Sequence, residues 1–121
     1  MQSTSLAGRT ILIVEDEPLI ALDIATACET VGALVLSAAT REDAARFVED
    51  ATLSAAVLDF GLKDGDAQPL CLRLNERNIP YVLHSGYTHC GDACHRGIVI
   101  AKPAAPTVVI AALLELLRRP A

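Results

Sequence analysis

Short apolar runs recur along the chain, separated by longer stretches in which apolar residues follow helical spacing. The runs are continuously apolar instead of alternating, which is typical of strands buried on both faces of a sheet. Five strands are therefore expected, at Thr10–Val14, Leu34–Ser37, Ala55–Asp59, Ile79–His84 and Ile98–Ala101.

The intervening stretches carry the start and stop signals of helices. Pro18 suits a first helical turn, Gly32 suits a helix end, and Thr40 begins a sequence that resembles a capping box. The expected helices run from Pro18 to Gly32, from Thr40 to about Asp50, from after Asp66 to about Asn78, and from Pro106 to about Arg119. The stretch 86–97 contains glycine and polar residues and predicts only a short or irregular helix.

This alternation of strands and helices predicts an α/β fold built on one doubly wound, five-stranded parallel sheet. Right-handed crossovers then place helices on both faces of that sheet. With 121 residues the chain is long enough to bury a core, and we expect a single domain over residues 1–121.

The charge of the chain argues against a strongly acidic partner. Ten lysines and arginines stand against fifteen acidic residues, so the net charge of −5 offers no basic face to nucleic acid or acidic lipid. No apolar run approaches the roughly 20 residues that cross a membrane, and residues 1–5 do not resemble a secretory signal. A cytoplasmic protein is expected, in which Cys28, Cys71, Cys90 and Cys94 are reduced.

Polar residues follow four of the apolar runs at the point where each run ends. Glu15 and Asp16 follow the first run, Asp59 ends the third, Ser85 follows the fourth and Lys102 follows the fifth. In an open parallel sheet, the carboxyl ends of the strands are where ligands bind. Each residue alone is common in a loop or at a helix start, but together and in this order they indicate one phosphoryl-transfer site.

These residue types suit the transfer of a phosphoryl group to aspartate. The Asp59 carboxylate can form an acyl phosphate, and Mg²⁺ (or Mn²⁺) would offset the repulsion between the two anions. Asp16 and Asp59 can supply carboxylate ligands, and Glu15 can act through a bound water. Lys102 and Ser85 can contact phosphoryl oxygens, which provides electrostatic stabilisation.

Over about residues 9–118, these motifs resemble a response-regulator receiver domain. The chain reads I-V-E-D-E at 13–17, A-V-L-D-F at 56–60 and A-K-P at 101–103. In that family an aspartate accepts a phosphoryl group from a histidine kinase or a histidine phosphotransfer protein. The resemblance makes Asp59 the phosphoacceptor and Glu15 and Asp16 the acidic pair, with Ser85 and Lys102 as the hydroxyl and the lysine of the site.

The resemblance also implies details of the fold and of the metal site. It implies the flavodoxin-like strand order 2-1-3-4-5, and direct metal ligation by Asp16, Asp59 and the backbone carbonyl of Gly61. It further implies a cis peptide bond between Lys102 and Pro103, which is accessible because the second residue is proline.

The segment between Ser85 and Lys102 departs from the usual receiver pattern. The family carries a switch aromatic three residues before the lysine, where this chain has Val99. Residues 79–87 resemble the signature of the FATGUY receivers, a subgroup that also lacks this aromatic and tends to lose its fourth helix. Tyr87, within that signature, is the candidate for a mobile aromatic in this chain.

The last helix is apolar on most sides. Val108, Ala112 and Leu116 lie roughly opposite the residues expected to face the sheet, and they predict a homodimer or effector surface. The residues expected to face the sheet are Ile110, Leu113, Leu114 and Leu117.

A second candidate interface lies on the first helix, where Leu22 points away from the core face. The resemblance implies that Leu22, with Leu19 and Thr26, forms the patch on which a phosphotransfer helix docks.

Histidines and cysteines around the fourth strand are the remaining candidates. His89-Cys90 and Cys94-His95 are zinc-type ligands in a short window, but adjacent pairs do not match the wider spacing of zinc modules. A variable loop is therefore favoured over a metal or redox site. His84, directly before Ser85, is expected to make a local hydrogen bond.

Three functions remain open. The first is a stand-alone receiver, a signalling phosphoacceptor whose only catalysis is its own phosphorylation and dephosphorylation. The second is a phosphatase of the haloacid-dehalogenase type, but that chemistry places a second aspartate two residues after the nucleophile, where this chain has Gly61. The third is a pseudo-receiver that binds partners without phosphorylation, and the full set of acidic, hydroxyl and lysine residues argues against it.

Overall fold

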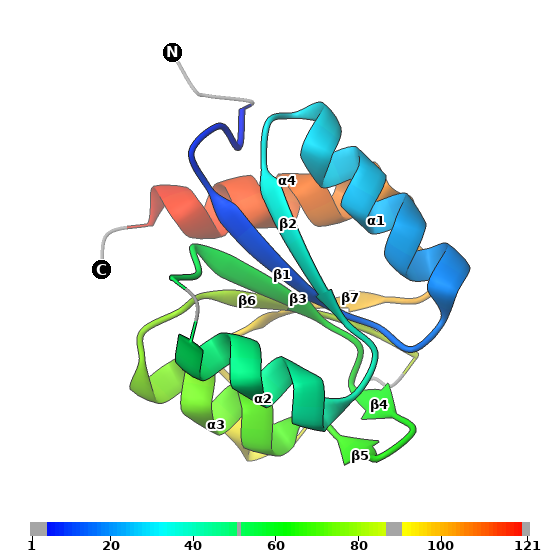
Figure 1. Ribbon diagram of the computed structural model, residues 1–121, viewed down its shortest axis with the longest axis vertical. Helices are drawn as coiled ribbons and strands as arrows, with labels where there is room; N and C mark the ends of the chain where they lie inside the picture. Colours follow the sequence, from blue (N-terminus) through cyan, green and yellow to red (C-terminus); the bar gives the residue numbers. More distant parts are fainter. Residues whose placement is uncertain (1–4, 51, 87–90, 120–121) are drawn as a thin grey trace.

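A computed structural model describes residues 5–50, 52–86 and 91–119 of the chain (Figure 1). Its main sheet consists of β1 (Thr10–Val14), β2 (Leu34–Ala38), β3 (Ala55–Leu58), β6 (Tyr81–Ser85) and β7 (Ile98–Ala101). The strand order is β2-β1-β3-β6-β7, and every pair of neighbours is parallel. The predicted five-stranded parallel sheet is confirmed, and its strand order is the order 2-1-3-4-5 that the resemblance implies.

Helices cover both faces of the sheet (Figure 1). The helices are α1 (Pro18–Thr30), α2 (Arg41–Asp50), α3 (Gln68–Glu76) and α4 (Pro106–Arg118). Helices α1 and α4 pack on one face, and α2 and α3 pack on the other, so the core consists of two layers. Within the described residues, no helix is long and apolar enough to cross a membrane.

Alternate residues of the central strands supply these two layers. On β1, Ile11 and Ile13 belong to the layer beneath α1 and α4, while Leu12 and Val14 belong to the layer beneath α2 and α3. Both sets are fully buried, because a parallel strand covered by helices on both faces has no solvent side. The continuous apolar runs of the sequence follow from this burial.

The edge strand β7 is covered on one face only. Ile98 and Ile100 pack into the layer beneath α1 and α4, whereas Val99 on the other face is 46% exposed. Between β6 and β7, the described residues contain only a three-residue 3₁₀ helix, η1 (Asp92–Cys94). The predicted short or irregular fourth helix is therefore confirmed, and it leaves the Val99 face of β7 open.

A disulfide joins Cys71 on α3 to Cys94 in η1. The expectation that these two cysteines are reduced is therefore wrong for this structure. That expectation rested on the redox compartment alone, whereas η1 packs against α3 and brings together residues that are 23 positions apart. Cys28, on the buried side of α1, is a free thiol, and Cys90 lies outside the described residues.

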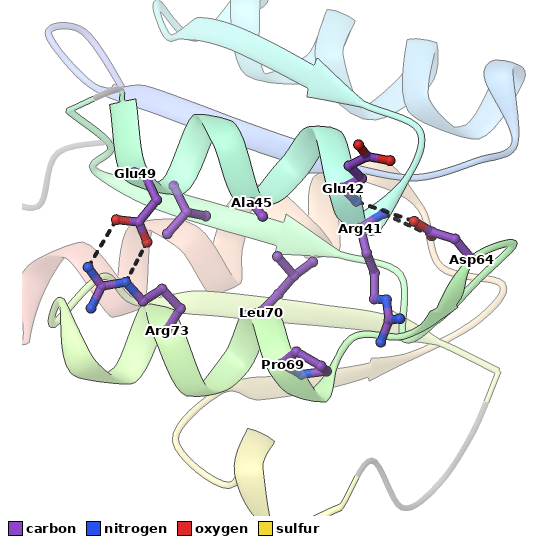
Figure 2. Close-up of a pocket in the computed structure, with 9 residues that line it drawn as sticks. Arg41, Glu42, Ala45, Glu49, Asp64, Pro69, Leu70 and Arg73 are labelled. Carbon is purple, nitrogen blue, oxygen red and sulfur yellow. Dashed lines mark hydrogen bonds and ion pairs between the residues drawn. The ribbon is translucent and has the colours of Figure 1, made fainter.

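A small antiparallel hairpin, β4 (Gly61–Leu62) and β5 (Gly65–Asp66), follows β3. Its tip is joined to the start of α2, because the Asp64 carboxylate accepts hydrogen bonds from the backbone N–H groups of Arg41 and Glu42 (Figure 2). The predicted cap of α2 is also present, since the Asp43 N–H donates to Thr40 Oγ1 at 3.1 Å. The hairpin thereby fixes the path of the chain directly after Asp59.

Helices α2 and α3 leave a crevice of about 290 Å³ between them. Figure 2 shows that its apolar floor includes Ala45 and Leu70, and that an ion pair between Glu49 and Arg73 crosses it. The charged groups of this crevice are thus largely satisfied by one another, and it lies apart from the acidic strand ends.

The predicted interface on the last helix is wrong for two of its three residues. Ala112 and Leu116 are buried, and only Val108, which is 48% exposed, faces outward. The buried stripe of α4 consists of Val109, Ala112, Leu113 and Leu116. Because this helix is apolar nearly all round, its periodicity does not determine which side faces the sheet; packing against α1 and β6 does.

Candidate functional site

Backbone hydrogen bonds continue the sheet past the ends of its strands and align the candidate residues. The Glu15 N–H donates to the Ala38 carbonyl at 3.0 Å, and the Asp59 N–H donates to the Val14 carbonyl at 2.8 Å. On the other side of the site, the Lys102 N–H donates to the Ser85 carbonyl at 2.8 Å. The strand ends therefore meet at one edge of the sheet, as expected for parallel strands.

Three carboxylates gather at this edge. One oxygen from each of Glu15, Asp16 and Asp59 lies within 4.8 Å of the other two. The ammonium group of Lys102 lies 2.9 Å from Glu15 Oε1 and 3.3 Å from Asp59 Oδ2. The structure thus brings together four of the predicted site residues, which come from three different strand ends.

Burial and charge give the carboxylates different proton affinities. Burial raises the pKa of Asp59 to about 6, the neighbouring Glu15 charge adds to the rise, and Lys102 opposes it. Burial also acts to raise the pKa of Glu15, but hydrogen bonds from Lys102 and from the Glu17 N–H outweigh burial and lower it. Asp59 therefore retains its proton to a higher pH than Glu15 does.

Lys102 balances part of this negative charge. Burial acts to lower its pKa, but its hydrogen bond to Glu15 and the charges of Asp59 and Glu15 outweigh burial, so its pKa lies above the usual value. The lysine is held charged beside two carboxylates. The peptide bond between Lys102 and Pro103 is cis, as the sequence analysis predicts.

The other predicted site residues lie around this cluster. Ser85 is the last residue of β6, fully buried and paired in register with Ala101 of β7. Gly61 begins the β4 strand two residues after Asp59. Tyr87, the candidate mobile aromatic, lies outside the described residues, as do His89 and Cys90 of the suggested ligand cluster.

His84 is a residue whose environment the sequence analysis predicted wrongly. It is buried on the α1 and α4 side of β6, and within the described structure neither of its ring nitrogens has a hydrogen-bond partner. Burial, together with the positive charge of Lys102, lowers the pKa of its imidazole. The only signal in the sequence is a polar residue at the end of an apolar run, and that pattern does not reveal which groups face the side chain.

The acidic cluster fits a hard divalent cation. Carboxylate oxygens are the ligands that Mg²⁺ prefers, and three carboxylates here face a single ammonium group. A bound cation would balance the remaining negative charge of the cluster, and it would lower the raised pKa of Asp59. Glu15, Asp16 and Asp59 are the residues that would hold it.

Comparison with known proteins finds no family model that matches the chain and no match among curated proteins. Similar solved structures are numerous. A CheY-like receiver domain protein from Methanospirillum hungatei JF-1 is 24% identical, with a TM-score of 0.82 over 90% of this chain and 93% of that one. The N-terminal domain of a response regulator/sensory box/GGDEF protein from Carboxydothermus hydrogenoformans is 27% identical, with a TM-score of 0.78 over 91% and 94%.

A third structure carries a metal. The receiver domain of the sensor histidine kinase PA1611 from Pseudomonas aeruginosa PAO1 was solved with a magnesium ion coordinated in its active-site cleft. It is 24% identical to this chain, with a TM-score of 0.80 over 93% of this chain and all of that one. The strand order and the acidic cluster at the carboxyl edge of the sheet agree with these matches. The fold of this chain is therefore similar to that of response-regulator receiver domains of the CheY-like type.

Proposed function

We propose that this receiver accepts a phosphoryl group on Asp59 in a Mg²⁺-dependent reaction, and that the phosphorylated form changes partner binding. One observation carries the proposal: the Asp59 carboxylate lies between a lysine ammonium at 3.3 Å and two further carboxylates within 4.8 Å. This arrangement combines a nucleophile, a charge partner for phosphoryl oxygens and a ligand set for a cation.

The reaction is an in-line displacement at phosphorus. An oxygen of ionised Asp59 forms the new P–O bond while the P–N bond to the phosphohistidine of a donor breaks, and the histidine nitrogen keeps the electron pair. With a pKa of about 6, Asp59 is mostly ionised at neutral pH even without a cation. Mg²⁺ or Mn²⁺, when bound, supplies positive charge that offsets the repulsion between carboxylate and phosphoryl group.

The remaining side chains position and stabilise the group that is transferred. Lys102 is held within reach of Asp59 by its hydrogen bond to Glu15, so its ammonium can pair with a phosphoryl oxygen without travelling far. Ser85 ends β6, which pairs with β3, the strand that leads into Asp59. The Ser85 hydroxyl is proposed to donate to a second phosphoryl oxygen. Asp16 and Asp59 would hold the cation directly, Glu15 would act through a bound water, and the carbonyl of Gly61 is proposed as a further ligand.

The partner side of the proposal rests on α1. Leu19 and Leu22 are 77% and 59% exposed, and the nearby Thr26 is also exposed. An exposed apolar patch on a helix that begins three residues after Glu15 suits a helical partner that presents its phosphohistidine to the acidic edge. A histidine kinase or a histidine phosphotransfer protein is the proposed partner.

Acetyl phosphate with Mg²⁺ tests the proposal without a partner. Intact-mass measurement is expected to show one phosphoryl adduct on the native chain, and none when EDTA replaces Mg²⁺. Asp59→Asn is expected to abolish the adduct, whereas the control Asp43→Asn, an exposed acid on α2, is expected to leave it unchanged. Labelling of Asp59→Asn at the native rate would contradict the proposal and favour a pseudo-receiver.

A further inference from the structure

The Cys71–Cys94 disulfide lies at the connection between β6 and β7, where the described residues form a three-residue 3₁₀ helix in place of a full helix. Cys94 belongs to η1, which stands in the connection between β6 and β7. Cys71 belongs to α3, which packs on the sheet through Leu70 and Leu74. The bond therefore ties a short, irregular connection to a firmly packed helix.

Apart from the disulfide, few interactions hold the segment 91–97. Its internal backbone hydrogen bonds are a bond of 3.1 Å from Gly97 to Cys94 and two of 3.3 Å, from Cys94 to Gly91 and from His95 to Asp92. A 3₁₀ turn of this length has no helical ladder of its own. The segment is thus held in place mainly by what it contacts on α3.

Hydrogen bonds with Asn75 of α3, and one of 3.4 Å from the Tyr81 hydroxyl of β6 to the Ala93 carbonyl, also fasten the segment. The Asn75 side-chain Nδ2 donates to the Ala93 carbonyl at 2.8 Å, and the Asn75 backbone carbonyl accepts from Arg96 at 3.3 Å. The Tyr81 hydroxyl donates to Asn75 Oδ1 at 2.9 Å and so orients the amide. These hydrogen bonds are part-buried or exposed, so a covalent link beside them changes how often the segment opens.

The segment leads directly into the functional edge of the sheet. Gly97 packs closely against the ring of Tyr81, since a Cβ placed there would be 2.5 Å from the ring atom Cε2. The next residue begins β7, and β7 ends at Ala101, beside Lys102. When residues 91–97 are held against α3, the start of β7 is therefore fixed in place. Lys102 of the functional site follows the other end of β7.

We expect the fold to form without the Cys71–Cys94 disulfide. Both cysteines lie in the apolar layer beneath α2 and α3, where a free thiol packs as a small apolar side chain. That layer also contains Leu70, Leu74 and Leu83, all buried. The described free cysteine, Cys28, lies in the opposite layer, away from both of these cysteines, and burial raises the pKa of its thiol to about 11.

We propose that Cys71 and Cys94 form a reversible thiol–disulfide site that fastens residues 91–97 to α3 when oxidised and releases them when reduced. The co-reactant is a low-molecular-weight disulfide. One cysteine thiolate attacks a sulfur of that disulfide and expels one thiol; the second cysteine then displaces the other thiol from the mixed disulfide. Two protein S–H groups are lost and two small thiols are formed, and a dithiol reverses both steps.

Hydrogen exchange on the intact chain tests this proposal without any phosphoryl chemistry. The chain carries Cys90→Ser so that this thiol takes no part, and it is equilibrated with glutathione disulfide or with dithiothreitol. Mass after thiol alkylation is expected to report a disulfide in the first case and two additional free thiols in the second. Exchange at the amides of Cys94, His95 and Gly97 is expected to be about tenfold faster in the reduced form, while the β6 amides of Val82 and Leu83 stay unchanged.

Variants separate loss of the bond from loss of the fold. Cys71→Ser and Cys94→Ser are each expected to reproduce the reduced exchange pattern in either buffer, and the control Cys28→Ser is expected to respond to both buffers like the parent. The proposal is overturned if no disulfide forms, if dithiothreitol reduces it only after global unfolding, or if oxidised and reduced chains exchange alike at residues 94–97.

The consequence for signalling rests on the proposed function. Beryllofluoride, a phosphoryl mimic, is expected to change exchange at residues 94–97 in the reduced form, and at least about threefold less in the oxidised form. If Asp59 is not an acceptor, beryllofluoride changes neither form while the redox difference persists. If the redox proposal is wrong, both forms respond equally and Asp59 is still labelled by acetyl phosphate.

Discussion

The ammonium group of Lys102 lies 2.9 Å from Glu15, a residue 87 positions away in the chain, and this pair connects the first strand of the sheet to the last. Glu15 is nearer to the lysine than Asp59 is, at 2.9 Å against 3.3 Å. When Asp59 carries a phosphoryl group, the Lys102 ammonium is already close enough to pair with a phosphoryl oxygen after a small side-chain movement. The pair therefore holds the lysine charged and close at hand until it is needed.

Lys102→Met is expected to raise the pKa values of both Glu15 and Asp59, because their nearest positive charge is removed while their burial remains. For Asp59 the rise starts from about 6. Carboxyl ¹³C chemical shifts followed across a pH titration measure it directly. The control Lys63→Met changes an exposed lysine in the β4–β5 hairpin and is expected to move neither value; unchanged titration in Lys102→Met would contradict the assigned ion pairs.

Asp59→Asn is expected to stabilise the fold at pH 7. The folded-state pKa of about 6 exceeds the ordinary value of 3.8, so between these values the folded chain keeps a proton that the unfolded chain releases. Stability from this group therefore falls as pH rises through that window and is absent at pH 7. Urea unfolding should show Asp59→Asn more stable by on the order of 1–3 kcal/mol at pH 7, and by much less at pH 4.

Mg²⁺ is expected to stabilise the native chain, because it binds the folded acidic cluster and not the dispersed carboxylates of the unfolded state. At a concentration one hundred times its dissociation constant, the gain is about 2.7 kcal/mol. Asp16→Asn removes one carboxylate of the cluster and should weaken this gain, measured as the rise in Tm with added Mg²⁺. Asp43→Asn serves as the control; an equal rise in both variants would place the bound metal elsewhere.

His84→Leu is expected to raise the free energy of unfolding by about 1 kcal/mol, since the buried imidazole has no described hydrogen-bond partner and leucine has no polar group to desolvate. The pKa of His84 is lowered, so the unfolded chain binds a proton that the folded one does not. This group therefore costs stability as pH falls below its ordinary value of 6.5. The variant should lose less stability between pH 7.5 and 5.5, measured by urea unfolding; His95→Leu, at an exposed position, is the control.

The sequence predicts the sheet well because its strands are buried on both faces and therefore read as continuous apolar runs. It also predicts the convergence of Asp59, Asp16 and Lys102, since parallel strands carry their carboxyl ends to one edge. Three features escaped prediction for physical reasons. The disulfide depends on how η1 packs on α3. The side of α4 that faces the sheet depends on its neighbours, because the helix is apolar nearly all round. The absence of described hydrogen-bond partners around His84 depends on residues distant in sequence.

The backbone bonds from Asp59 to Val14 and from Lys102 to Ser85 make the site a product of strand register. A slip of one residue in a parallel strand turns every side chain of that strand to the opposite face of the sheet. The side chains that pack in one core layer would then point into the other layer, and the packing of both layers would be lost. Buried residues far from the acidic edge therefore control the alignment of acceptor and lysine. Substitutions deep in β3 or β7 can change phosphoryl transfer without touching any of the groups that carry it out.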